Sequence, residues 1–86
     1  MLEYIKTVLR VKTNAYDLEI ENLINAAKLD LGIAGIAIVD DALVNRAIAT
    51  YCKMNFGECD NYDKLKASYD EQKAQLKIAG DYRADG

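Results

Sequence analysis

Three glycines, Gly32, Gly57 and Gly80, each follow a segment whose apolar residues recur at helical spacing. This spacing is typical of an amphipathic α-helix, because it places the apolar side chains on one face. Glycine often ends a helix, since without a Cβ atom it easily adopts the left-handed conformation that follows the last turn. The sequence therefore predicts an all-α fold in which each glycine ends one of three main helices.

A fourth, shorter helix is expected at the N-terminus, where Leu2, Ile5, Val8 and Leu9 recur at helical spacing. The helix that ends before Gly57 is the most apolar of the four and is predicted to lie at the centre of a small bundle. The helices are expected over residues 2–10, 16–31, 41–56 and 61–79.

Polar residues precede the main helices at positions suited to N-caps. Asn14 is the expected cap of the second helix, Asp40 or Asp41 of the third, and Asp60 of the fourth. Side-chain oxygens of these residue types accept hydrogen bonds from the first free N–H groups of a helix. The acidic pair Asp40-Asp41 is interpreted as capping, because no further carboxylates or histidine can be identified to converge on it as a metal or acid–base site.

The connection between the second and third helices is predicted to be an apolar loop, running from Ile33 to Val39. Seven residues are too few for a separate buried helix, and a short extended piece is stable only when it packs on something else. Two interpretations stay open, a loop packed on the core and a contact between subunits. Ile33, Ile36, Ile38 and Val39 are the candidate interface residues, and Ile36→Asp is expected to abolish the oligomer without loss of helicity.

The 86 residues suffice for one domain, expected over residues 1–80 and followed by a polar tail over 81–86. A chain of this size has a small core, so association with other subunits is an expected source of stability. Tyr82 lies outside any helical stripe, and Tyr82 and Arg83 are the candidate residues for docking a partner.

The composition points away from catalysis. Histidine is absent, and Cys52 and Cys59 have no neighbouring base that would lower a thiol pKa, so they are predicted to be structural thiols. No metal, cofactor or enzymatic activity is predicted. No apolar run is long enough to span a bilayer and no secretion signal is recognised, which favours a soluble protein of a reducing cytoplasm.

The charge balance disfavours tight binding of nucleic acid. The chain has 11 basic and 14 acidic residues and a net charge of −3, whereas a duplex-binding domain usually has a basic face. A small helix-turn-helix DNA-binding regulator is kept as the alternative function. Its recognition helix would be residues 61–79, which begins among acids, Asp60 and Asp63, that phosphates repel.

The order of the blocks along the chain resembles that of a known family. The N-terminal part of the pattern comprises Tyr4-Ile5-Lys6, Leu9-Arg10-Val11, Asp17, Glu19, Ile20, Leu23, Ile24, Ala26 and Ala27. The C-terminal part comprises Ala47, Ile48, Tyr51, Phe56-Gly57, Leu65 and Ser68-Tyr69. In this order and spacing the chain resembles the head–tail connector (adaptor) proteins of long-tailed bacteriophages and prophages, over about residues 2–76.

This resemblance implies a structural role that composition could not indicate. Such proteins form rings of about a dozen subunits by repeating one contact around an axis. The ring docks on the portal protein, extends the channel through which DNA passes without specific binding, and receives the next connector or tail component. The resemblance thus implies a non-enzymatic subunit of the virion head–tail junction, made in the host cytoplasm. In relatives the segment after the fourth helix contributes to portal docking, and this chain is short there.

Overall fold

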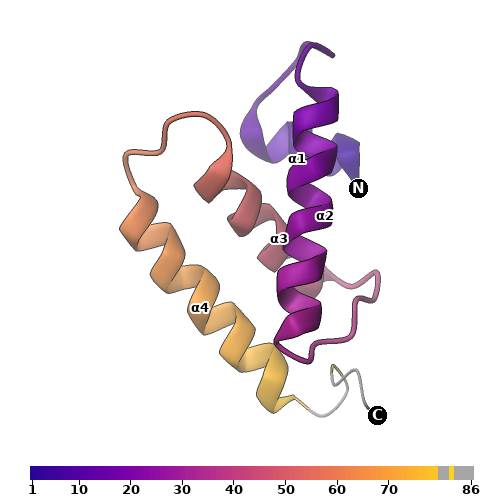
Figure 1. Cartoon of the computed structure of the whole chain (residues 1–86), viewed down its shortest axis with the longest axis vertical. Coiled ribbons are helices and arrows are strands. Elements are labelled where there is room, and N and C mark those ends of the chain that lie inside the picture. The colour runs from indigo at the N-terminus through magenta and orange to yellow at the C-terminus, as the bar shows by residue number, and fades with distance from the viewer. Residues whose placement is uncertain (80–81, 83–86) are drawn as a thin grey trace.

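The computed structural model describes residues 1–79 and Tyr82, and in these residues the protein is all-α (Figure 1). The predicted fold class is confirmed. The helices of this part of the chain are α1 (Leu2–Leu9), α2 (Asp17–Ile33), α3 (Ala42–Asn55) and α4 (Tyr62–Ile78).

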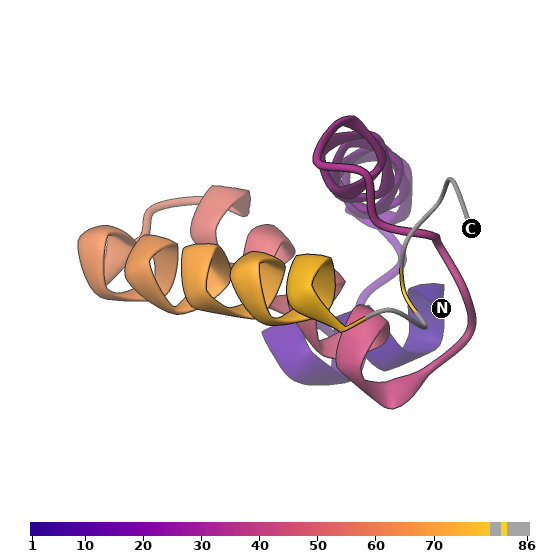
Figure 2. The same ribbon diagram turned by 90° about the horizontal axis from the view of Figure 1, so that it is seen from below.

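Helix α3 is the centre of the bundle, as predicted, because it contacts each of the other three helices. Helices α2 and α4 both pack on α3; they diverge at one end of the bundle and approach each other at the other, where α2 ends (Figure 1 and Figure 2). The short α1 packs against both α2 and α3. The molecule is elongated, with principal extents of 39 × 24 × 19 Å.

The core is aliphatic and is formed mainly by α2 and α3. Its one buried aromatic residue within the described part of the chain is Tyr69 of α4, which packs edge-on against Tyr51 with ring centroids 5.5 Å apart. The buried apolar residues are Ile5, Ile20, Ile24, Ala27, Leu31, Ile36, Val44, Ala47, Ile48, Ala49, Cys52, Met54, Tyr69 and Leu76.

The connection between α1 and α2 is organised around a buried lysine. The Lys6 ammonium donates to Asn14 Oδ1 at 2.8 Å and pairs with Asp17 Oδ1 at 2.9 Å. A buried charge is tolerated only when it is paired, so these two partners hold the connection close to α1. The predicted capping role of Asn14 is therefore wrong: its side chain bonds Lys6, and Tyr16 precedes α2 without a side-chain cap.

The end of α2 also differs from the prediction. Gly32 lies inside the helix, which continues to Ile33, and the residue with a positive φ is Gly35, at +85°. There the Gly35 N–H donates to the Gly32 carbonyl and the Ile36 N–H donates to the Leu31 carbonyl. Glycine permits a helical conformation as well as a left-handed one, so the first glycine in the sequence did not have to end the helix.

The ends of α3 follow the sequence closely. Asp41 caps its N-terminus, accepting hydrogen bonds from the N–H groups of Leu43 at 2.8 Å and Val44 at 3.4 Å. Gly57, at a φ of +62°, follows its C-terminus as predicted. Helix α4 begins after Asn61 without a side-chain cap, so the prediction of Asp60 as a cap is wrong. The predicted stop at Gly80 lies outside the described residues.

None of the helices in the described ranges combines the length and hydrophobicity that crossing a bilayer requires.

Candidate subunit-docking groove

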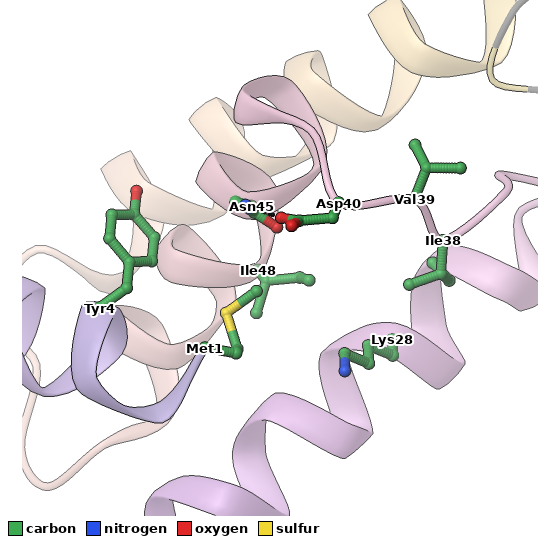
Figure 3. A pocket seen from close by; sticks show the side chains of 8 residues that line it. All are labelled: Met1, Tyr4, Lys28, Ile38, Val39, Asp40, Asn45 and Ile48. Carbon is green, nitrogen blue, oxygen red and sulfur yellow. Dashed lines mark hydrogen bonds between the residues drawn. The ribbon is translucent and has the colours of Figure 1, made fainter.

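A surface groove of about 620 Å³ opens between the start of α1, the middle of α2, the 38–40 loop and α3 (Figure 3). Its size is in the range of sites that receive several side chains or a small molecule. The lining residues are Met1, Tyr4, Lys28, Ile38, Val39, Asp40, Asn45 and Ile48.

The groove has an apolar floor and two apolar walls. Ile48 of α3 is fully buried and forms part of the floor, while Met1 and Tyr4 stand on one side and Ile38 and Val39 on the other (Figure 3). These four wall side chains are each about two-fifths exposed. Apolar side chains that converge on an open groove suit the burial of a neighbouring apolar surface.

The polar side chains of the groove lining are Lys28, Asp40 and Asn45. The Asn45 side-chain amide donates to Asp40 Oδ1 at 3.0 Å, which ties the 38–40 loop to α3. Lys28 extends into the groove from α2 and makes no ion pair with any residue that the structure describes. The lining thus combines an apolar body with the Lys28 ammonium and the Asp40 carboxylate, and it has no cysteine or hydroxyl nucleophile paired with a base.

The four predicted interface residues occupy different environments. Ile33, at the end of α2, is 86% exposed, and Ile38 and Val39 line the groove. Ile36 differs from the expectation, because its side chain is only 1% exposed and belongs to the core. The interpretation of a loop packed on the core therefore holds for Ile36, and the contact between subunits stays a prediction for the exposed Ile33, Ile38 and Val39. The substitution Ile36→Asp would place a charge in the core and disturb folding, so it cannot test a surface contact.

The tail residue Tyr82 lies against the same loop. Its carbonyl accepts a hydrogen bond from the Ala37 N–H at 2.7 Å, and its hydroxyl donates to Asp41 Oδ2 at 2.8 Å. Its ring is partly buried against the core. The Tyr82 hydrogen bond is the largest influence that lowers the pKa of the Asp41 carboxyl, and the helix N–H groups add to it. The second candidate docking residue, Arg83, lies outside the described residues.

A polar cluster joins α2 to α4 away from the groove. Asp30 Oδ2 accepts a hydrogen bond from the Tyr69 hydroxyl at 2.6 Å and one from the Lys73 ammonium at 3.1 Å. The hydrogen bond from Tyr69 is the main cause that lowers the pKa of the Asp30 carboxyl, and Lys73 adds to it. Burial, followed by the Asp30 carboxylate, raises the pKa of the Tyr69 hydroxyl. This arrangement fixes two helices relative to each other and leaves no group free to react.

The two cysteines lie in different environments. Burial raises the pKa of the Cys52 thiol to about 11, so it is protonated and unreactive at neutral pH. Cys59 is half-buried in the loop after α3, and both thiols are free. Within the described residues, no group of three potential metal ligands comes together.

Sequence reasoning missed two features of the surface. The first is the contribution of Met1 and Tyr4 to a groove wall, which depends on how α1 packs. The second is the exposure of Leu18 and Leu29, which project from α2 on the side away from its buried stripe. Plotting the helix positions around the axis would have revealed these two leucines, because they lie about three turns apart on one face.

The comparisons with known proteins identify the family. A search of curated proteins and a search of solved structures each gave no match to the chain. A family model described as "phage connector protein" matches residues 1–83 and so covers all four helices. That family consists of structural proteins and is not an enzyme family. The chain therefore belongs to the phage connector protein family and has a structural connector role.

Proposed function

We propose that the protein is a ring-forming subunit of the phage head–tail junction, which docks on the portal and extends the DNA channel toward the tail. The observation that carries this proposal is the family match over residues 1–83. The exposed apolar groove supports it, because a subunit of an assembly must keep an apolar surface available for its neighbours.

A closed ring is built from a heterologous contact, in which each subunit presents two different surfaces to its two neighbours. Ile33, Ile38 and Val39 are proposed to take part in this contact, Ile33 on one surface and Ile38 and Val39 on the other. Their exposure favours this role, since an exposed aliphatic side chain gains free energy when a neighbour removes it from water.

The net charge supports a channel that DNA traverses without binding to it. Each subunit carries a net charge of −3, and a ring multiplies that charge around the axis. Phosphates are repelled by such a surface, and tight binding would need clustered lysine and arginine side chains to displace counterions.

The tail is the proposed second contact, directed toward the portal through Tyr82 and Arg83. Tyr82 supports this placement because its backbone and hydroxyl are both bonded to the segment that leads into α3. Tyr82, one residue of the 81–86 tail, thus lies beside the loop that carries Ile38 and Val39. Portal docking and the subunit contact would then occupy neighbouring parts of the protein.

Deletion of the coding sequence from the phage or prophage genome tests the proposed function. Heads that package DNA but carry no tail are expected, because the component between the portal and the tail is missing. Supplying the wild-type chain from a plasmid should restore tailed particles. Electron microscopy of the particles gives the result, and tailed, infectious particles in the absence of the chain would contradict the proposal.

A further inference from the structure

Helix α2 carries a second apolar stripe on the face that points away from the core. Leu18, Leu29 and Ile33 are 73%, 70% and 86% exposed, whereas Ile20 and Leu31 on the opposite face are fully buried. A helix at a protein surface normally has a polar outer face. We call Leu18, Leu29 and Ile33, with the residues between them on this face, the outer stripe.

The outer stripe is uncharged along its length. Its two apolar ends are joined by Asn22 and Asn25, which are exposed amides on the same side of the helix. From Leu18 to Ile33 the stripe extends about 22 Å, at about 1.5 Å per residue. Its Leu29 and Ile33 are one turn apart, a spacing with which helices insert neighbouring anchors into an apolar groove.

We propose that the outer stripe of one subunit occupies the groove of the next copy of this chain. Heterologous closure requires two different surfaces on each subunit, and the outer stripe and the groove supply them. Leu29 and Ile33 would enter between the walls formed by Met1 and Tyr4 on one side and Ile38 on the other. This inference rests on the proposed ring and identifies both halves of its contact.

One pair of opposite charges can meet across the two surfaces. The groove lining holds the Lys28 ammonium as well as the Asp40 carboxylate, and Glu21 lies beside the outer stripe, exposed and without an ion pair among the described residues. A contact between copies would allow the Lys28 ammonium of one subunit to approach the Glu21 carboxylate of the other. The uncharged stripe also limits repulsion between copies that each carry a net charge of −3.

Three matched substitutions test this contact in the full chain. Leu29→Glu charges the outer stripe, Ile38→Glu charges the groove, and Ile78→Glu is the control, because Ile78 of α4 is 80% exposed and belongs to neither surface. Association is measured by analytical ultracentrifugation at roughly 100 µM subunit, a concentration at which contacts with micromolar Kd are populated. Far-UV circular dichroism and thermal melting verify that each variant folds.

Leu29→Glu and Ile38→Glu are each expected to weaken association by at least about 30-fold, the loss typical of a central anchor at an interface. Ile78→Glu should associate like the wild type. A wild-type protein that remains monomeric at this concentration, or a Leu29→Glu variant that folds and still assembles, would overturn the proposed contact.

Mixing the two variants distinguishes a heterologous contact from a symmetrical one. The Leu29→Glu variant retains an intact groove, and the Ile38→Glu variant retains an intact outer stripe. An equimolar mixture should therefore form a heterodimer that cannot grow, because one productive contact remains. If no heterodimer forms, the outer stripe of one subunit does not bind the groove of the next. Either failure leaves the head–tail role open to its own test, the deletion of the coding sequence.

Discussion

Asp30 illustrates how one carboxylate can fix the packing of two helices. It accepts hydrogen bonds from Tyr69 and Lys73, so α2 and α4 are joined at the edge of the core. The ionised form of Asp30 is the form that is stabilised, and its pKa is lowered from the ordinary value of 3.8. The stabilisation is therefore complete above about pH 4 and is lost as the pH falls through the pKa of the folded state.

We expect Asp30→Asn to lower the melting temperature at neutral pH, because the hydrogen bonds from Tyr69 and Lys73 no longer end on a negative charge. The difference from the wild type should shrink as the pH falls from 5 toward 2, since the wild-type carboxylate is then protonated as well. Thermal melts followed by circular dichroism across this range measure the effect. Asp60→Asn is the control, because the Asp60 side chain bonds no residue that the structure describes. A constant difference between wild type and Asp30→Asn at every pH would contradict the explanation.

At the scale of the elements, the ends of α2 and α3 show what a glycine does in this fold. Gly32 is a helical residue in the last turn of α2, whereas Gly35 and Gly57 have left-handed φ values of +85° and +62°. A Cβ atom at Gly32 or Gly35 would contact nothing within 4 Å. Backbone conformation, and not space, therefore decides how substitutions at these positions affect stability.

Gly32→Ala is expected to stabilise the protein by about 0.5–1 kcal/mol, because alanine loses less conformational freedom than glycine in a helix. Gly35→Ala should destabilise it by about 1–2 kcal/mol, since an L-residue is strained in the left-handed region. Urea unfolding of the two variants beside the wild type gives both values. If both substitutions changed the free energy of unfolding by the same amount in the same direction, α2 would have to end at another residue.

The sequence was sufficient to predict the four helices, because the spacing of apolar residues along each segment shows that they share one face of a helix. It predicted that Asp40 or Asp41 would cap α3 and that Gly57 would end it, because both signals are local; the structure has Asp41 as the cap and Gly57 just after the helix. It could not choose between Gly32 and Gly35, because both conformations are available to glycine. Nor could it predict that Lys6 would engage Asn14, because that contact depends on the packing of α1.

The candidate site was predictable only in part, because a groove is a property of packed elements. Ile38 and Val39 were identified from an apolar run, and the same run wrongly included the buried Ile36 among the surface residues. An extended segment alternates its side chains, and the face that becomes buried is decided by the helices around it. Met1 and Tyr4 gave no such signal, since the crossing of α1 over α3 is a tertiary feature.

At the scale of the whole molecule, the charge distribution predicts no tight binding to duplex DNA. A gel-shift titration at low salt should show no complex at about 1–10 µM protein, because few phosphates can be neutralised by a chain of net charge −3. Low salt favours any electrostatic binding, so the absence of a shift under these conditions is informative. A sequence-specific complex that persists as salt rises would instead support a DNA-binding regulator.

The hydrogen bonds from Tyr69 to Asp30 and from Tyr82 to Asp41 join the second quarter of the chain to its last quarter. During synthesis, α2 and the start of α3 leave the ribosome well before either tyrosine. Neither carboxylate can then receive its tyrosine hydrogen bond until the segment that carries that tyrosine has been made. The final packing of the bundle must consequently be a late event, and a chain released before α4 would lack the bonds that hold α2 and the start of α3 in place.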